Sequence, residues 1–450
     1  MSNEIIVGLD IGTTKIACFI GQVGENGKIK ILGWGKTTSI GVQHGEVKNI
    51  IDTAADIRRA VDEASEKANY DVTEVYVGIA GKHIKSMQNR GSIMLSEPSK
   101  IIDKNDIKQL IDNQRNIMLP AGEEIIHIIP QTFFVDKVEL TVNPIGVPGN
   151  CLEAVFHIVT GNTKCLENIK NSVLNAGLRI KGVVLEPIAS AESTLDDDEK
   201  KAGVALVDIG GGTTDIAIFE KGVIRHTAVI PLAGNLITED IHKGCTIARF
   251  EQAENLKIKF GCCLPSEVNA DDIVSMPGLR GQPPREISMK TLAGIINSRA
   301  TQILEIVERE IELAGYDKRL IGGIVLTGGG AQLKHIKELT AYITAKHTRI
   351  GVPNEYLEKA GEIEHPMYAT GVGLVLYGLK EAKENQDTAK QQPKKQDIDF
   401  VDFENAAEAI AEEQPKTTDK PKTSPTAGIA GFGKSVSKWL NDFFKEDDIN

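Results

Sequence analysis

The sequence predicts an α/β protein made of two related lobes that face each other across a cleft. The stretch VGLDIGTTKIACFIG (residues 7–21) returns as ALVDIGGGTTDIAIFEKG (residues 205–222). Each copy is an apolar run, an aspartate, a turn rich in glycine and threonine, and a second β-rich run. The spacing is too long for a solenoid repeat, so the copies indicate two domain cores. A third glycine cluster, residues 328–330, also follows a strand-like run.

Length, charge and cysteine content exclude several classes of protein. A chain of 450 residues has room for several domains, and its 41% hydrophobic and 25% charged residues are typical of a globular protein. The net charge of −12 argues against nucleic-acid binding through a broad basic surface. The six cysteines form no C-x-x-C pair and no signal sequence precedes the first strand, so we expect free thiols in a reducing cytoplasm. No apolar run approaches the length that spans a membrane.

The first half of the chain is interpreted as an α/β core that carries an insertion. Residues 49–68 place apolar side chains at helical spacing, with Ile50, Ile51, Ala54, Ile57 and Val61 on one face. The strands expected around this helix are residues 4–9, 14–20, 29–37 and 75–80. The stretch 84–159 has signals of its own and predicts an inserted subdomain, with a helix at 106–118 and strands at 125–129 and 133–140.

The second half begins with another helix and strand, which lead to the second copy of the repeat. Residues 162–177 are predicted to be helical and 182–185 extended, followed by Glu186. Residues 292–314 predict a long amphipathic helix, residues 321–327 a strand, and a further helix is expected to start near Gln332. Globular signal ends near Leu379, and the polar stretch 381–428 predicts a disordered linker.

The repeated turns and the third glycine cluster are candidate phosphate-binding loops. Glycine lets backbone N–H groups approach a polyphosphate closely, and a lysine adds a cation. The strand before each repeated turn ends in an aspartate, Asp10 or Asp208, and such carboxylates suit a hydrated Mg²⁺ ion. The candidate loops are Gly12, Thr13, Thr14 and Lys15; Gly210, Gly211, Gly212, Thr213 and Thr214; and Gly328, Gly329 and Gly330. One such cluster alone is usually a tight turn, but three clusters that each follow a strand favour a ligand site.

The end of the chain predicts an amphipathic helix at residues 429–446. On a helical wheel its apolar side chains fall within an arc of about 140°, with lysines opposite. The apolar side chains are Ile429, Phe432, Val436, Trp439, Leu440, Phe443 and Phe444. This pattern is typical of a helix in a membrane interface; a helix docked in a partner's groove is the alternative. Acidic residues after the stripe weaken attraction to anionic lipid, so we expect weak binding by one helix and avidity in a polymer.

Several stretches together resemble one protein family. They are VGIAGKHIKS (77–86), PQTFFVDKVEL (130–140), NPIGVPGNCLEAVFHIVT (143–160), LEPIASAEST (185–194), GVALVDIGGGTTDIAIF (203–219), AGNLITEDI (233–241), AENLKIKFG (253–261) and LTGGGAQL (326–333). They resemble the FtsA family of bacterial cell-division proteins, a member of the actin-like ATPase superfamily. The resemblance covers residues 1–380 almost continuously and resumes at the terminal helix.

The resemblance implies an actin-like fold of two ribonuclease-H-like lobes with an insertion peculiar to this family. The implied divisions are the core of lobe one (1–83 and 160–195), the inserted subdomain (84–159), the core of lobe two (196–225 and 304–380), the upper subdomain of lobe two (226–303), the linker (381–428) and the amphipathic helix (429–446). It also implies a protein that binds ATP and Mg²⁺, forms filaments and tethers the FtsZ ring to the cytoplasmic face of the cell membrane at the division site. Other division proteins would bind the inserted subdomain.

Two groups of residues acquire roles only through the resemblance. In the family the upper subdomain of lobe two binds the C-terminal tail of FtsZ, and Arg285, Lys290 and Arg299 lie in that range, where they suit an acidic peptide. A solvated helix face is the alternative for these three residues. Gly234, Glu254 and Lys257 match the nucleotide site, the last two at positions that contact ribose and base. A plain surface ion pair is the alternative for Glu254 and Lys257.

Hydrolysis of ATP would need a polarised water in line with the terminal phosphate. Glu186 is the candidate for polarising it, beside Asp10 and Asp208. No further catalytic base is recognisable, so we expect slow turnover at most. Bound ATP would mainly hold the two lobes together. The alternative functions are a sugar or acetate kinase of the same superfamily and a PilM-like pilus scaffold. The long polar linker and the terminal helix argue against both alternatives.

Overall fold

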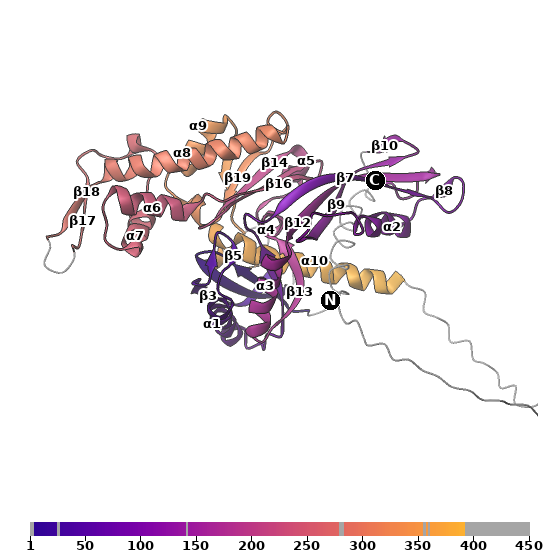
Figure 1. Ribbon diagram of the computed structural model, residues 1–450, viewed down its shortest axis with the longest axis horizontal. Coiled ribbons are helices and arrows are strands. Elements are labelled where there is room, and N and C mark those ends of the chain that lie inside the picture. Colours follow the sequence, from indigo (N-terminus) through magenta and orange to yellow (C-terminus); the bar gives the residue numbers. More distant parts are fainter. Residues whose placement is uncertain are drawn as a thin grey trace, which may run out of the picture.

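Two five-stranded sheets of the same topology form the cores of two lobes, and a four-stranded sheet is inserted into the first lobe (Figure 1). The computed structural model describes residues 4–24, 28–140, 143–278, 283–353, 357–358 and 361–391, with side chains to residue 383. The terminal amphipathic helix and most of the predicted linker lie outside these residues. Within the described part of the chain, no helix is both long and apolar enough to cross a bilayer.

Lobe one is built from β1 (Ile6–Ile11), β2 (Lys15–Val23), β3 (Ile29–Thr38), β4 (Val42–Gln43), β5 (Glu46–Val47), α1 (Ile50–Ala68), β6 (Glu74–Ile79), α3 (Thr163–Asn175), β13 (Arg179–Leu185) and α4 (Glu186–Thr194). The inserted subdomain contains β7 (Lys85–Met94), β8 (Lys100–Ile101), α2 (Lys104–Gln114), β9 (Glu123–Val135), β10 (Val138–Leu140), β11 (Pro148–Gly149) and β12 (Cys151–Asn162). Lobe two follows with α5 (Asp197–Ala202), β14 (Val204–Ile209), β15 (Thr214–Glu220), β16 (Val223–Ile230), α6 (Gly234–Gly244), α7 (Phe250–Phe260), β17 (Ile273–Met276), β18 (Arg285–Ser288), α8 (Met289–Leu313), β19 (Gly323–Thr327), α9 (Ile336–Thr344) and β20 (Thr348–Ile350). The last described element is α10 (Ala369–Gln391).

The sequence repeat corresponds to a structural repeat. The sheet order is β13-β6-β1-β2-β3 in lobe one and β16-β15-β14-β19-β20 in lobe two. In both sheets three antiparallel strands are followed by two parallel ones. The two turns share the same closing bond: Gly12 N donates to Lys15 O at 3.0 Å, and Gly210 N donates to Thr213 O at 2.9 Å. The prediction of two related α/β cores is confirmed.

Helix α10 comes last in the described chain but packs on lobe one, against α4 and strands β1, β2 and β6. A Cβ atom on Gly8 of β1 would lie 2.8 Å from the carbonyl oxygen of Gly371, so glycine is needed where the helix crosses the strand. The prediction that residues 304–380 all belong to the core of lobe two is therefore wrong for this helix. The helix continues to Gln391, so residues 381–391 are helical and not part of the linker.

The inserted sheet, of order β10-β9-β12-β7, also bonds to the edge of lobe two. Gln131 Nε2 donates to the carbonyl oxygens of Ile224 and Arg225, at 3.0 and 2.7 Å, and Ser86 Oγ donates to Thr227 O at 3.1 Å. Figure 1 shows β7, β9 and β12 beside β16. The insertion is thus rooted in lobe one and attached to lobe two.

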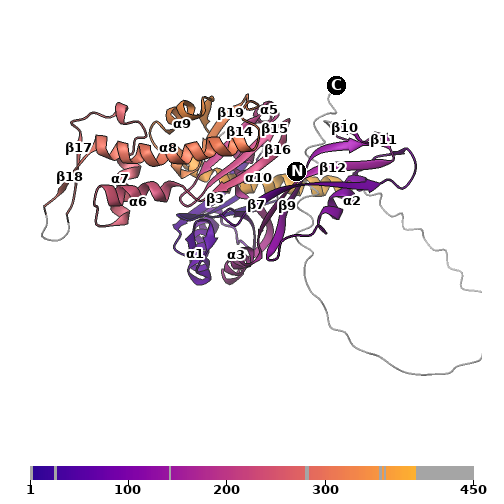
Figure 2. The same ribbon diagram turned by 45° about the horizontal axis from the view of Figure 1, so that its top comes forward.

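Several predicted boundaries fall inside continuous elements. Strand β16 runs through residue 226 to Ile230, and α8 runs through residues 303 and 304 without interruption, so neither residue divides the subdomains of lobe two. Figure 2 shows α8 extending from the hairpin β17–β18 to the sheet of lobe two. After the third glycine cluster a 3₁₀ turn covers Gly329–Gln332, and α9 begins only at Ile336, later than the predicted start near Gln332.

Candidate functional site

The two repeated turns touch each other across the gap between the lobes. A Cβ atom on Gly211 would lie 2.3 Å from Thr14 Cγ2, and one on Gly212 would lie 2.5 Å from Thr13 Oγ1. Real Cβ atoms do not approach so closely, so these two positions require glycine for the lobes to meet. The backbones of both turns are therefore available to one ligand at the same point.

Each turn is held in place by neighbouring backbone. In lobe one, Gly45 N donates to Thr13 Oγ1 at 2.9 Å. In lobe two, the first N–H groups of α6 are used in the same way, since Gly234 N donates to Gly210 O at 3.0 Å and Asn235 N donates to Gly211 O at 2.8 Å. The N-terminus of α6 therefore positions the turn of lobe two.

A cavity of about 290 Å³ lies between the turns. It is lined by every residue predicted for the nucleotide and its ion except Thr214: Asp10, Gly12, Thr13, Thr14, Lys15, Glu186, Asp208, Gly210, Gly211, Gly212, Thr213, Gly234, Glu254, Lys257, Gly328, Gly329 and Gly330. Thr214 is fully buried, and its hydroxyl donates to Leu232 O at 2.8 Å, so its side chain joins the start of β15 to the loop after β16 and does not line the cavity. The predicted residues, with Thr214 as the exception, thus meet at one cavity, and their binding of a nucleotide stays a prediction.

The third glycine cluster approaches the same cavity from the strand next to β14. Gly328 has φ of +83°, which favours glycine, and a Cβ atom there would lie 2.3 Å from Asp208 Oδ1. Any side chain at this position would displace the carboxylate. The cluster is therefore shaped around Asp208.

Four carboxyl groups, those of Asp10, Glu186, Asp208 and Asp215, line the cavity together with the partly buried lysine Lys15. Asp10 forms an ion pair with Lys15. Asp208 Oδ2 accepts a hydrogen bond from Ser190 Oγ at 2.8 Å and another from Thr370 Oγ1 at 3.3 Å. Ser190 lies on α4, which contacts strands of both lobes, and Thr370 lies on α10, which packs on lobe one, so two helices outside the sheet of lobe two hold this aspartate. The remaining carboxyl groups, Glu186 and Asp215, also line the cavity.

This concentration of negative charge changes the acidities of the site. Burial raises the pKa of Glu186 well above its usual value, and the charges of Asp10, Asp215 and Asp208 add to the effect. Burial, together with Asp10, also raises the pKa of Asp208. Burial and the neighbouring Asp208 raise the pKa of Asp215 to about 8. Burial opposes the charge of Lys15, but the carboxylates of Asp10, Glu186 and Asp208 outweigh it and raise the pKa of Lys15.

The carboxyl groups that line this cavity outnumber its two lysines, Lys15 and Lys257. A magnesium ion prefers oxygen ligands, and all four carboxyl groups offer oxygens to the cavity. Asp215 Oδ1 is buried and has no hydrogen-bond partner among the described residues. This oxygen is therefore available to bind a metal ion or to accept a hydrogen bond from water. The residues present therefore fit a divalent cation. Asp10 and Asp208 are its candidate ligands, and Asp215 lies beside Asp208.

The sequence analysis missed several cavity residues. Asp215 lies directly opposite Asp208 in the pairing of β14 with β15. The signal was present: after the two threonines of the turn, the first repeat has Lys15 and the second has Asp215. Asn235 lines the cavity as well. Ser190 and Thr370 act on Asp208 from helices that are distant in sequence, and no motif marks them.

Glu254 and Lys257 form a network at the side of the cavity. Lys257 Nζ bonds Glu254 Oε2 at 2.7 Å, Thr238 Oγ1 at 2.8 Å and Gly234 O at 3.0 Å. Burial lowers the pKa of Lys257. The lysine side chain is only 11% exposed, so the pair is not a plain surface ion pair.

The three basic residues predicted for an acidic peptide do not form one surface. Arg299 Nε and Nη2 bond the carboxylate of Asp240 on α6 at 2.6 and 3.0 Å. Arg285 Nη1 donates to Thr246 O at 2.7 Å. Lys290 is exposed, but it precedes Arg299 by nine positions on α8, which is about 180° around a helix. Lys290 and Arg299 therefore lie on opposite sides of α8.

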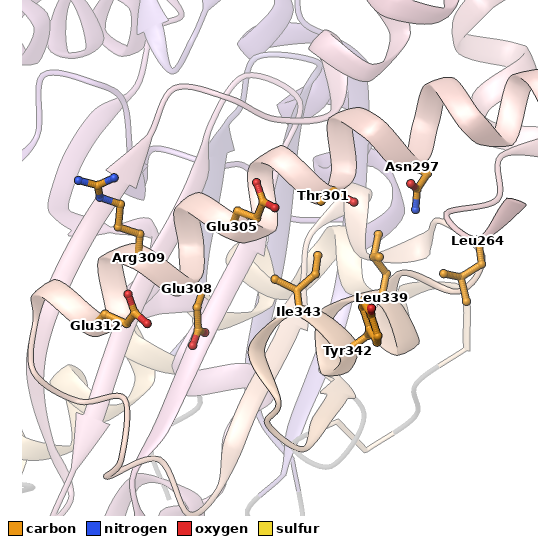
Figure 3. A pocket seen from close by; sticks show the side chains of 10 residues that line it. All are labelled: Leu264, Asn297, Thr301, Glu305, Glu308, Arg309, Glu312, Leu339, Tyr342 and Ile343. Atoms are coloured by element: carbon orange, nitrogen blue, oxygen red, sulfur yellow. The ribbon is translucent and has the colours of Figure 1, made fainter.

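A second cavity, of about 810 Å³, lies between α8 and α9. Figure 3 shows Glu305, Glu308 and Glu312 along α8 and the apolar side chains of Leu339 and Ile343 on α9. Among the described residues, no glycine loop lines this cavity. The cleft between the lobes, where backbone from both turns converges on buried carboxylates, remains the candidate for a phosphate ligand.

Comparison with known sequences identifies relatives over most of the chain. Residues 205–373 match the family described as "Cell division protein FtsA", and residues 81–160 match "SHS2 domain inserted in FTSA". Cell division protein FtsA of Pseudomonas aeruginosa is 38% identical over 379 residues, which cover 84% of this chain and 90% of the relative. FtsA of Escherichia coli K12 is 34% identical over 383 residues, with coverage of 84% and 90%.

Comparison with solved structures supports the fold. The PilM–PilN type IV pilus biogenesis complex aligns with a TM-score of 0.61 at 15% identity, covering 84% of this chain and 99% of that chain. MreB 5 of Spiroplasma citri, bound to AMPPNP, aligns with a TM-score of 0.52 at 15% identity, covering 86% and 100%. At this identity the likeness concerns the fold, which is actin-like.

Proposed function

The chain belongs to the FtsA family of cell division proteins, and from this premise we propose that it is an ATP-binding scaffold that polymerises and tethers an FtsZ ring to the cytoplasmic face of the cell membrane. The observation that carries the proposal is the contact between the two glycine turns at a cavity lined by four carboxyl groups, of which Asp10, Asp208 and Asp215 are buried. A triphosphate bound there would interact with both lobes at once. Nucleotide would then bias the closure of the lobes and with it the surfaces that meet in a filament.

The charge in the cleft supports binding of ATP together with Mg²⁺. Nucleotide phosphates would be repelled by Asp10, Asp208 and their neighbours unless a cation lay between them, and Lys15 supplies only one positive charge. Bound Mg²⁺ would supply charge neutralisation at the phosphates. Glu186, which begins α4, is the residue we assign to orienting a water, and the rise in its pKa by burial favours the neutral acid over a base. Because no further catalytic base is recognisable, we expect slow hydrolysis at most.

Membrane attachment is assigned to the terminal helix, residues 429–446, on its sequence pattern. Its apolar stripe would bury in the interface, and a filament would present many copies of it on one surface, so that weak individual binding adds up. The inserted subdomain is assigned to other division proteins. In support, it exposes the apolar side chains of Met94, Ile101 and Val138, which are 74%, 64% and 64% exposed.

Of the three basic residues Arg285, Lys290 and Arg299, we propose that Arg299 binds the acidic tail of FtsZ. Replacing Arg299 with glutamate should weaken binding of a peptide from that tail by about tenfold or more, because a charge-assisted bond becomes a repulsion. Fluorescence anisotropy with a labelled peptide measures this. Lys290 offers the matched control, since Lys290→Glu makes the same charge change on the opposite side of α8 and should leave affinity within twofold. Equal losses in both variants would contradict a site at Arg299 and point to general charge attraction.

The whole proposal is tested by sedimentation with vesicles. Full-length protein should pellet with lipid vesicles, more strongly with ATP and Mg²⁺ than without, whereas a chain that ends at residue 428 should bind ATP equally well but remain in the supernatant. If the chain that ends at residue 428 still pelleted with vesicles, the proposed role of the terminal helix would be refuted. Sugar- or acetate-dependent release of ADP would refute the scaffold and favour a kinase.

A further inference from the structure

Three side chains that can bind a metal ion meet at the root of the inserted subdomain, outside the nucleotide cleft. Glu46 comes from β5, His83 from the turn after β6, and Cys165 from the first turn of α3. One ligand atom of each lies within 4.8 Å of the others. The insertion leaves lobe one just after His83 and returns just before Cys165, so the cluster sits where both connections join the lobe.

Two glycines bring these segments together. Gly45 and Gly81 have φ of +73° and +131°, and a Cβ atom on Gly45 would lie 2.8 Å from Gly81 Cα. A Cβ atom on Gly81 would lie 2.8 Å from His83 Nδ1. The turn is closed by a bond from Ile84 N to Gly81 O at 3.0 Å. The imidazole of His83 therefore occupies space that exists because residue 81 has no side chain.

His83 is buried without the partners that a buried imidazole requires. Its side chain is 5% exposed, and neither ring nitrogen has a hydrogen-bond partner among the described residues. Glu46 Oε1 is 4.0 Å from Nδ1, which is beyond hydrogen-bond distance. The other carboxylate oxygen, Oε2, is held by Lys48 Nζ at 2.5 Å, so Oε1 remains on the side of the imidazole. Leaving buried polar atoms unpaired is unfavourable, and a ligand between the imidazole and the carboxylate would remove the penalty.

We propose that Glu46, His83 and Cys165 bind one Zn²⁺ ion and leave a fourth position for water. Thiolate, imidazole and carboxylate are the three ligand types of protein zinc sites, and a mixed set of three with an open position is typical of zinc. Zinc bonds of about 2.0–2.3 Å in a tetrahedron place ligand atoms roughly 3.3–3.8 Å apart, so side-chain movements of about 1 Å complete the site. On binding, the Cys165 thiol loses its proton to solvent as the sulfur–zinc bond forms.

The charges around Cys165 are mixed. Burial and the charge of Glu46 raise the pKa of Cys165, while Lys48, Lys82 and Lys164 oppose that rise. A zinc ion would hold the sulfur as thiolate by bonding to it directly. With one thiolate and one carboxylate the bound ion would be neutralised locally, so the lysines would not expel it.

The site would fasten the insertion to the part of lobe one that carries the first glycine turn. Glu46 is next to Gly45, whose N–H bonds Thr13, and Asn168 Nδ2 of α3 donates to Val47 O at 3.2 Å. A zinc ion at this point would therefore join α3, the start of the insertion and the support of the Thr13 turn. This inference is independent of the proposed ATP function.

The test is a titration of metal-free full-length protein with Co²⁺, which replaces Zn²⁺ and reports its ligands by absorption. We expect a sulfur-to-cobalt charge-transfer band near the ultraviolet that saturates at one equivalent and disappears when Zn²⁺ is added. Cobalt in the nucleotide cleft would have only oxygen ligands and would give no such band, so failure of the ATP proposal would leave the result unchanged. Absence of the band in the native protein would overturn the zinc site.

Variants identify the ligands. Cys165→Ser should abolish the sulfur band, and His83→Gln should weaken cobalt binding at least tenfold. Cys151 provides the matched control because it is also a partly exposed free thiol, and Cys151→Ser should keep the band unchanged. Glu46→Gln leaves the thiol and imidazole in place and should retain the band at reduced affinity, which keeps the proposal testable if His83→Gln does not fold. A band that survives in Cys165→Ser, or is lost in Cys151→Ser, would refute the assignment.

Discussion

Replacing Asp208 with alanine is expected to weaken binding of the Mg²⁺–ATP complex by about 10- to 100-fold, the usual effect of losing a carboxylate that orients a metal ion. ATP-dependent polymerisation should be lost with it. Asp208 is where three elements meet: Ser190 of α4 and Thr370 of α10 donate to its carboxylate, and Gly328 is shaped around it. A change at this residue therefore affects both the ion and the contact between the lobes. Titration with a fluorescent ATP analogue measures the first effect, and light scattering with electron microscopy measures the second.

A second variant separates charge from shape. Asp208→Asn keeps the size of the side chain and an oxygen that accepts from Ser190, but removes the negative charge. In Mg²⁺ it should bind ATP more weakly than the native protein, and in EDTA it should bind at least as well, because one source of repulsion toward the phosphates is gone. Asp71→Ala, at an exposed position, is the control and should change neither affinity. Normal filaments from Asp208→Ala would show that nucleotide and polymerisation are not coupled through this site.

The fold and much of the cavity lining could be predicted because both depend on short, continuous stretches of sequence. An apolar strand, an aspartate and a glycine turn must lie together whatever surrounds them, and the repetition of that unit indicates that two lobes exist. The structure confirms the duplication down to the closing bond of each turn, from Gly12 to Lys15 O and from Gly210 to Thr213 O. That the cavity binds a nucleotide stays a prediction.

The wrong and missed predictions concern features that are determined by tertiary packing and not by local sequence. The apolar first half of α10 can cover either lobe, and close approaches such as that between Gly8 and Gly371 select lobe one. The hydroxyl groups of Ser190 and Thr370 reach Asp208 across long sequence separations, so no spacing reveals them. Thr214 belongs to the turn motif, but the alternation of side chains along β15 directs it away from the cavity.

Replacing both Trp439 and Phe443 with glutamate should release the protein from vesicles while leaving ATP affinity unchanged. Both residues lie on the apolar stripe of the terminal helix. Burial of one such side chain is worth about 1.5–3 kcal/mol, so the loss of two lowers the partition of each helix by at least about 100-fold before the added charges are counted. Because a filament multiplies the contribution of each helix, the loss should be complete even with ATP. Flotation with vesicles, with and without ATP, measures it.

The control distinguishes apolar burial from electrostatic attraction. The double variant Lys438→Gln and Asn441→Glu changes the net charge by the same amount but lies on the polar side of the helix. If apolar burial dominates, as the acidic residues after the helix indicate, this variant should still float with neutral vesicles and lose only the part of its binding that depends on anionic lipid. Equal release of both variants would mean that charge governs attachment. Retention of the Trp439 and Phe443 variant on vesicles would remove the terminal helix from the membrane role and leave a partner's groove as its site.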